Sequence, residues 1–223
     1  MKLIHFNLTS ELLGGVTRYT EWIMESPEVF FAYVGELNDQ IAGKEGKFVL
    51  SENNKELELS KAADLLINPF STEVNTRKIL NKLYLELTER SREEQMYMKT
   101  VELFNHIQEY MLELEQQSSY ILDFNRETDV SILLKALSVQ YEVKETGYWE
   151  RLIQYIKIMA SAAGIKVFIF VNLRSYLSDA QMEELIKELE YQDVSGLFIE
   201  NQQRSCLKGV KWYIIDKDQC EIY

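Results

Sequence analysis

Residues Lys166 to Asn201 read KVFIFVNLRSYLSDAQMEELIKELEYQDVSGLFIEN, and they carry the clearest structural pattern of the chain. The run KVFIFVN is short, β-branched and aromatic, which is typical of a strand buried on both faces. Ser178 then supplies an N-cap, and Gln181 completes a capping box, so AQMEELIKELEYQ is predicted to be a helix. SGLFIEN follows as a second buried strand. The stretch therefore predicts a βαβ unit whose two strands are parallel neighbours.

The same stretch lacks the residues that bind a nucleotide. In nucleotide-binding domains such a strand commonly ends at a metal-holding acid, whereas KVFIFVN ends at Asn172. No G-x-x-x-x-G-K-[ST] loop occurs in the chain, and GGVTR at residues 14–18 lacks the required lysine and is better interpreted as a turn. We expect an α/β scaffold related to nucleotide-dependent proteins that neither binds nor hydrolyses a nucleotide.

Composition predicts a folded, soluble protein. Apolar residues make up 46% of the chain and aromatic residues 12%, which is typical of a folded chain. The net charge of −12 counts against simple coating of nucleic acid, because phosphate contacts need clustered Lys and Arg. Cys206 and Cys220 lack metal-ligand spacing and are expected to be reduced thiols. Without a signal peptide or an apolar run of transmembrane length, the expected location is cytoplasmic, away from membranes.

Glycine placement separates a central helical region from its flanks. All nine glycines lie at or before Gly46 or at or after Gly147, and the residues between them suit long helices. Two series of apolar residues recur there at helical spacing, with a polar break near residues 89–94. The series are Ile79, Leu80, Leu83, Leu87 and Tyr97, Phe104, Ile107, Met111, Leu114, Ile121. We expect an antiparallel helical arm whose apolar stripe packs within the chain, against another subunit, or both.

The order of these regions predicts an α/β fold. Residues 1–70 and 140–223 are expected to form a head domain with a mainly parallel sheet, and residues 71–139 an inserted helical leg domain. KLIHFNLT, VFFAYVGEL, KFVLSE, VQYEVK and KWYIIDKD are expected to be strands. VSILLKAL and YWERLIQYIKIMASAAG are expected to be helices, the second stopped by Gly164.

Acidic residues accumulate at the end of the predicted arm. In DFNRETD, the carboxylates of Asp123, Glu127 and Asp129 crowd a predicted break between helices, with Glu115 upstream. Hard cations such as Ca²⁺ need several oxygen ligands on a bend, although this spacing is not that of a helix-loop-helix calcium loop. A solvated acidic helix face is the other interpretation.

Four basic residues surround the predicted helix that begins at Tyr148. Arg151 and Lys157 lie on it, Lys166 follows it, and Lys135 precedes it. They form either one basic stripe or a set of separately solvated side chains. No Ser, Cys or His belongs to a nucleophile or metal motif, so no catalytic residue is predicted.

The order and spacing of four stretches resemble the Csn-two family of CRISPR-associated proteins, which accompany type II-A systems. The stretches are AADLLINPFSTEVNTRKILNKLYLEL, LDFNRETDVSILLKALSVQYE, YWERLIQYIKIMA and VFIFVNLRSYLSDAQMEELIKELEYQDVSGLFIE. In that family, an apolar strand ending in Asn leads to a hydroxyl-capped acidic helix and then to a strand ending in L-F-hydrophobic-Glu, which matches Leu197 to Glu200 here. The similarity spans residues 62–200.

The resemblance implies a head that is a degenerate relative of P-loop ATPases, a helical leg, and assembly as a homotetrameric ring. It implies calcium-dependent binding of linear double-stranded DNA at free ends, without catalysis, during acquisition of new spacers. The integrase complex and the RNA-guided effector nuclease of the same CRISPR system would be partners. By this resemblance the calcium candidates are Glu115, Asp123, Glu127 and Asp129, and the DNA-binding candidates are Lys135, Arg151, Lys157 and Lys166.

The chain departs from the family at the basic cluster. Where relatives carry several lysines after the helix, SAAGIK supplies only Lys166, and the acidic bend is about one residue shorter. Weaker DNA binding is one consequence, and use of other lysines such as Lys44, Lys47, Lys208 and Lys211 is another.

Two alternatives compete with the DNA-end-binding scaffold. One is a nuclease that holds two cations through Asp123, Glu127 and Asp129, although these acids lie far from the strand ends where α/β sites usually form. The other is a structural oligomer of helical arms that has no DNA role.

Overall fold

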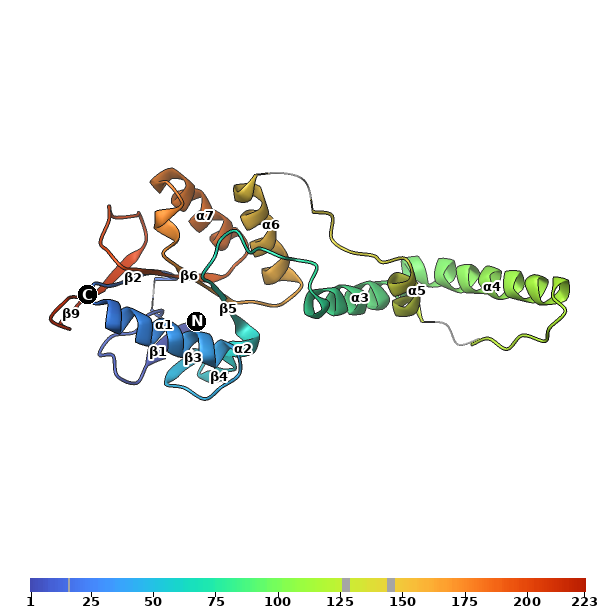
Figure 1. Cartoon of the computed structure of the whole chain (residues 1–223), viewed down its shortest axis with the longest axis horizontal. Coiled ribbons are helices and arrows are strands. Elements are labelled where there is room, and N and C mark those ends of the chain that lie inside the picture. Colours follow the sequence, from blue (N-terminus) through green and yellow to red (C-terminus); the bar gives the residue numbers. More distant parts are fainter. Residues whose placement is uncertain (16, 126–128, 144–146) are drawn as a thin grey trace. The chain divides into compact units, whose positions relative to one another are not determined.

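The structure is a computed structural model that describes residues 1–15, 17–125, 129–143 and 147–223 (Figure 1). The chain divides into two compact units. The first comprises Met1–Glu73 with Lys144–Tyr223, and the second comprises Val74–Val143. These divisions fall a few residues from the predicted domain boundaries at 70 and 140. No described helix combines the length and the apolar character needed to cross a membrane.

A six-stranded sheet forms the centre of the first unit, in the order β5-β6-β7-β2-β8-β9. Neighbouring strands are parallel, apart from the antiparallel pair β8 and β9 at one edge. The predicted parallel pairing within the βαβ unit is confirmed, because Val167 lies opposite Ser195 and Val171 opposite Ile199. The strands are β2 (Tyr19–Met24), β5 (Ala63–Leu66), β6 (Val167–Val171), β7 (Ser195–Glu200), β8 (Lys211–Ile215) and β9 (Glu221–Ile222).

Helices cover both faces of this sheet (Figure 1). On one face lie α6 (Tyr148–Ser161) and α7 (Asp179–Tyr191), and α7 begins with the predicted capping box. On the other face lies α1 (Pro27–Ile41) with a small antiparallel sheet. The small sheet contains β1 (Lys2–His5), β3 (Phe48–Glu52) and β4 (Lys55–Leu57), and two short helices complete the unit, α2 (Leu59–Ala62) and η1 (Leu173–Ser175). The mixed α/β architecture with a mostly parallel sheet is thus confirmed.

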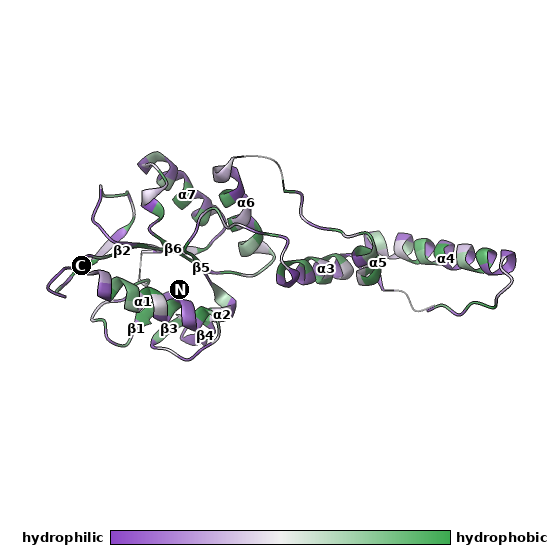
Figure 2. Ribbon diagram, viewed as in Figure 1, coloured by the Kyte–Doolittle hydropathy of each residue, from purple (hydrophilic) through white to green (hydrophobic). Residues whose placement is uncertain are grey.

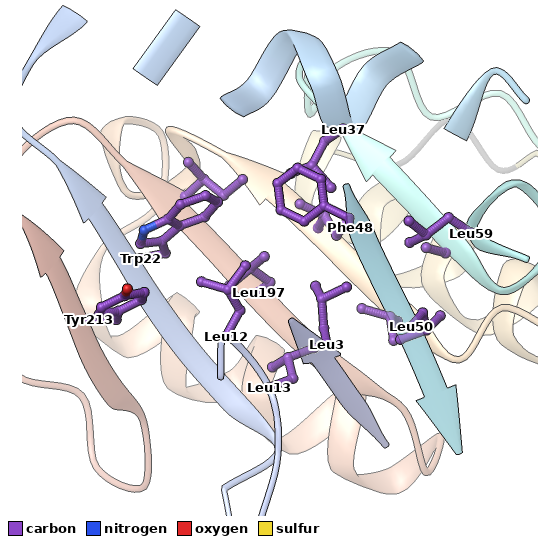
Figure 3. Packing of buried hydrophobic residues seen from close by; sticks show 14 of the residues in the cluster. Leu3, Leu12, Leu13, Trp22, Leu37, Phe48, Leu50, Leu59, Leu197 and Tyr213 are labelled. Atoms are coloured by element: carbon purple, nitrogen blue, oxygen red, sulfur yellow. The ribbon is translucent and has the colours of Figure 1, made fainter. Parts of the chain in front are cut away.

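The main hydrophobic core lies between the large sheet, α1 and the small sheet (Figure 3). Trp22 of β2 stacks on Tyr213 of β8 with ring centroids 6.4 Å apart, and Leu37 of α1 is fully buried. On the opposite face, Phe170 and Phe198 stack at 5.4 Å. Each such buried side chain stabilises the fold by about 1.5–3 kcal/mol relative to an exposed one.

Gly196 is required by close packing on that opposite face. A Cβ atom added there would lie 3.0 Å from Leu189 Cδ1 of α7, which is closer than ordinary van der Waals contact. The absence of a side chain therefore lets the last turns of α7 approach β7.

The prediction of a strand over VFFAYVGEL is wrong, since these residues belong to α1. The Ser26 side chain accepts a hydrogen bond from the Val29 amide and so caps the helix. Pro27 occupies the first turn, where a backbone N–H has no helical carbonyl to bond, so the missing N–H of proline does not weaken the helix. Six consecutive apolar residues resemble a strand, but Val29, Tyr33 and Leu37 recur at helical spacing against the core.

The second unit contains α3 (Arg77–Ser91), α4 (Glu94–Gln117) and α5 (Val130–Ala136). α5 packs on α3, and the Tyr84 hydroxyl of α3 donates to the Val139 carbonyl at 2.8 Å. The predicted break between the long helices falls at Arg92 and Glu93. In Figure 1, α4 runs on from α3 instead of folding back along it, so the expected antiparallel pair is not formed.

The predicted strand VQYEVK is also wrong, because residues 139–143 have no regular structure. The side-chain amide of Asn75 takes the place of a neighbouring strand. Its Oδ1 accepts from the Tyr141 amide at 3.0 Å, and its Nδ2 donates to the Tyr141 carbonyl at 3.0 Å. Lys144, the last residue of that run, lies outside the described residues.

Many apolar residues of α4 stay exposed to solvent in the described chain. None of its residues is buried, although hydrophobic positions recur along its length (Figure 2). Its exposed large apolar side chains are Met96, Tyr97, Met98, Val101, Leu103, Tyr110, Leu112 and Leu114. Such a density of exposed apolar groups is typical of a surface that another molecule covers.

Candidate functional site

The carboxyl ends of β6 and β7 form the edge where α/β proteins usually bind ligands. β6 ends at Asn172, whose backbone is left-handed with φ 52° and ψ 32°. Asn tolerates this conformation better than most residues. Its side-chain Oδ1 accepts from the Asn201 amide at 3.2 Å, just beyond the end of β7. Asn172 therefore links the ends of β6 and β7 by a hydrogen bond, and it stands at the end of β6, where nucleotide-binding domains commonly carry a metal-holding acid.

A buried arginine lies directly behind that edge. Arg174, in η1, has a side chain only 1% exposed. Its Nη1 donates to both carboxylate oxygens of Glu21 at 2.8 and 3.1 Å, and its Nη2 donates to Asp179 Oδ1 at 2.7 Å. Ser205 accepts further hydrogen bonds through its carbonyl and its hydroxyl. The guanidinium is thereby neutralised by two carboxylates of the same chain, so it stabilises the fold and is not available to bind a phosphate.

Glu200, the last residue of β7, is the unusual acid of this edge. It is fully buried, and its Oε1 accepts from the Arg174 backbone amide at 3.0 Å. Burial, with a further contribution from the Glu21 charge, raises the pKa of Glu200 to about 7. Among the described residues its Oε2 has no hydrogen-bond partner. Burial therefore favours the protonated form of Glu200 well above the pH at which an exposed glutamate ionises.

The predicted DNA-binding residues do not gather in one place. Arg151 lies in the first turn of α6, and Lys166 lies beyond its last turn, next to the start of β6. Lys157 is six residues from Arg151, which at about 100° per residue puts it about 120° away around the helix axis. Lys135 lies in α5 of the second unit. The single basic stripe considered from the sequence is therefore not formed by the three residues of the first unit.

Two of these cations are paired within the chain. Lys157 Nζ lies 3.5 Å from Glu188 Oε2, and Lys166 pairs with Glu52. These partners are partly exposed, so each pair contributes about 1 kcal/mol or less and does not prevent a phosphate contact. Lys166 also borders a surface pocket with Arg18, which adds a cation that the sequence did not single out.

Arg151 has aromatic surroundings. Its guanidinium carbon lies 4.2 Å from the centroid of the Tyr148 ring, and Tyr148 contacts Phe70, which contacts Tyr176. No local sequence pattern predicts this cluster, because its members are far apart in the chain. Phe70 follows β5 and Tyr176 follows β6. Because parallel strands end at the same edge of a sheet, strand pairing alone would have predicted that these two residues lie near each other.

The predicted calcium ligands are likewise separated. Asp129 is the N-cap of α5 and accepts from the Ser131 amide at 3.1 Å, a bond that lowers the pKa of its carboxyl. It lines a pocket with Arg92 and Phe104. Phe104, which lies beside Asp129 in this pocket, precedes Glu115 by 11 residues, or about 16 Å along α4. Glu115 and Asp129 are therefore too far apart to share one ion. Glu115 lies instead beside the segment that carries Asp123, so the set of four ligands stays a prediction.

Glu115 instead closes the far end of α4, where its Oε1 accepts from the Leu122 amide at 3.2 Å. Asp123 is exposed, and Glu127 lies outside the described residues. Within the described ranges, no three acidic, His or Cys side chains come together as a metal site. The described acids alone do not fit a calcium ion.

Comparison with known families agrees with the order of elements found here. Residues 40–219 match the family model described as CRISPR-associated protein (Cas_Csn2). The match includes the β6-α7-β7 unit, all of the second unit, and the strand edge that carries Asn172 and Glu200. Because this covers well over half of the 223 residues, the chain belongs to the CRISPR-associated Csn-two (Cas_Csn2) family.

Proposed function

We propose that this protein is a non-catalytic scaffold that binds free ends of linear double-stranded DNA in CRISPR adaptation, the acquisition of new spacers. The observation that carries the proposal is the family match over residues 40–219. The integrase complex and the RNA-guided effector nuclease of the same system are its proposed partners.

The strand edge supports a role without nucleotide chemistry. We interpret the sheet as a degenerate relative of the P-loop ATPase fold in which internal side chains occupy the ligand-binding edge. Arg174 is neutralised by Glu21 and Asp179, and Asn172 links the two strand ends. A guanidinium already held by two carboxylates offers little to a nucleotide phosphate.

Assembly as a homotetrameric ring would reconcile a net charge of −12 with DNA binding. Only the inner surface of a ring has to be basic, and nonspecific phosphate contacts suffice for spacers of arbitrary sequence. The exposed apolar residues of α4 supply a surface for part of this assembly. The same observation favours the second candidate, a structural oligomer of helical arms.

We propose the calcium requirement on the family resemblance and on the acids of residues 123–129, with Glu115 beside them. Because the described acids do not form a site by themselves, any ion held here needs Glu127, groups from the DNA, or another copy of the chain. No step of the proposed function is assigned to the ion.

One binding experiment separates the candidates. The purified protein is incubated with a linear duplex and with the same sequence as a closed circle, in calcium or in magnesium. Retention of the linear duplex without cleavage, in calcium, supports the scaffold. Cleavage that is lost when Asp123 and Asp129 are replaced would support the nuclease, and absence of retention would leave the structural oligomer.

A further inference from the structure

Three aromatic side chains form an exposed cluster on the first unit. The Phe70 ring contacts the Tyr148 ring at 4.8 Å and the Tyr176 ring at 5.4 Å, with interplanar angles of 77° and 86°. The three residues remain 48%, 58% and 52% exposed, respectively. Single exposed apolar residues are ordinary, but here two rings contact a third between them, and each keeps about half of its surface in water, so the three form a patch.

The backbone holds these rings in fixed positions. Asn68 Oδ1 accepts from the Phe70 amide at 3.0 Å, and Asn68 Nδ2 donates to the Ser71 hydroxyl at 3.0 Å, so the turn after β5 is closed. The Tyr176 amide donates to the Leu173 carbonyl at 2.9 Å, and Tyr148 is the first residue of α6. A surface whose side chains are already positioned loses little conformational entropy when a ligand binds.

Arginines flank the rings. The Arg151 guanidinium lies over the Tyr148 ring, and its Nε is buried without a hydrogen-bond partner in the described chain. Arg204 Nη2 donates to the hydroxyl of Ser175 at 3.3 Å, directly before Tyr176 in the chain. The patch thus offers flat apolar surfaces for a planar group and positive charge for an anion beside it.

We propose that Phe70, Tyr148 and Tyr176 form a stacking platform for unpaired nucleobases at a DNA end, with Arg151 and Arg204 contacting the adjacent phosphates. The ligand is a short single-stranded overhang. This deepens the proposed function and rests on it for the identity of the ligand as DNA. Aromatic rings beside arginines are the combination that binds single-stranded nucleic acid without sequence preference.

The test compares duplexes that share one sequence and differ only at their ends. One is blunt and the other carries a four-nucleotide overhang with 2-aminopurine, whose fluorescence falls when it stacks. A third probe is the overhang sequence as a single strand. We expect tighter binding of the overhang duplex, with quenching, by about five- to a hundredfold for each stacked base.

The variant Phe70→Leu/Tyr148→Leu/Tyr176→Leu keeps apolar volume and removes the rings. It should lose the overhang preference and the quenching while binding the blunt duplex as before. Tyr191→Leu is the matched control, because Tyr191 is 83% exposed at the end of α7 and takes no part in the cluster. Thermal melting of both variants checks the fold.

The outcomes separate this inference from the proposed function. Equal affinity for blunt and overhang duplexes, or quenching that survives in the triple variant, overturns the platform and leaves duplex binding intact. Quenching of the single strand that depends on the rings, without binding of either duplex, keeps the platform and overturns duplex-end binding. A triple variant that changes the native mass and not the quenching identifies the patch as a protein contact and also overturns the platform.

Discussion

At the scale of single residues, the buried charges around Arg174 depend on the order of the strands in the sheet. Glu21 of β2 and Arg174, which follows β6, are 153 positions apart and meet because only β7 separates these two strands. The local pattern predicted that β7 ends in an apolar run followed by Glu200, but not that the carboxyl group is buried. Burial depends on what packs over a strand end, and that is decided by strand order and not by neighbours in the sequence.

Glu200 should make stability depend on pH. Its pKa is raised to about 7 in the folded protein, from an ordinary value of 4.5, so the folded state binds more protons than the unfolded state between these values. Stability therefore falls as the pH rises through this window, by an amount on the order of 3 kcal/mol if the whole shift is realised. Glu200→Gln keeps the acceptor for the Arg174 amide and removes the titration. Urea unfolding at pH 5 and pH 8 should show a flatter pH dependence for Glu200→Gln than for the wild type; equal pH dependence contradicts the assignment.

At the scale of secondary-structure elements, local patterns were sufficient where the signal is local. The capping box at Ser178 and Gln181 identified the start of α7, and the β-branched run identified β6. Local patterns gave the wrong element for α1, because a short apolar run is compatible with either a strand or a helix. They were also wrong near Tyr141, because the backbone there bonds to the Asn75 side chain and not to a neighbouring strand. The break between α3 and α4 was predictable, but the direction of the chain after it was not.

The apolar surface of α4 predicts an assembly defect without a folding defect. Ile107→Glu/Leu114→Glu puts charges on a helix with no buried residues in the described chain. If another copy of the chain covers these positions, each buried charge destabilises the contact by several kcal/mol. The native mass should fall while the helical content stays the same. A folded double variant with unchanged native mass shows that α4 is not the assembly surface.

Calcium binding at residues 123–129 should appear as added stability. A cation that binds only the folded state, at a hundredfold excess over its dissociation constant, stabilises by about 2.7 kcal/mol. Asp129→Asn is the informative variant, because Asn also caps helices and so preserves the start of α5 while removing a charge. We expect calcium to raise the Tm of the wild type and to raise that of Asp129→Asn less. A wild-type Tm that does not change across millimolar calcium contradicts a site in this segment.

At the scale of the whole molecule, composition alone argued against DNA, and the family match argues for it. A net charge averages over the surface, whereas binding depends on where the cations lie. The fold class and the βαβ unit were predictable because they depend on periodicity. The distribution of Lys135, Arg151, Lys157 and Lys166 was not, because it depends on how elements pack within each unit.

The four basic candidates should act through phosphates, and this gives the salt dependence of binding a definite form. Each phosphate contact releases counterions, so each side chain that makes one contributes about 0.9 to the slope of log affinity against log salt. The variant Lys135→Ala/Arg151→Ala/Lys157→Ala/Lys166→Ala should therefore bind linear duplex more weakly and with a flatter slope. The loss should be similar for unrelated sequences, because phosphates carry no base identity.

Lys44→Ala/Lys47→Ala is a suitable control, since it also removes cations from the first unit but leaves the four candidates in place. If the control flattens the slope and the four-site variant does not, the DNA path follows the other lysines of the chain. In either case, a ring that DNA must enter by its end should bind a closed circle far more weakly than the same DNA once cut. Equal affinity for the two forms at matched salt contradicts threading, whichever lysines make the contacts.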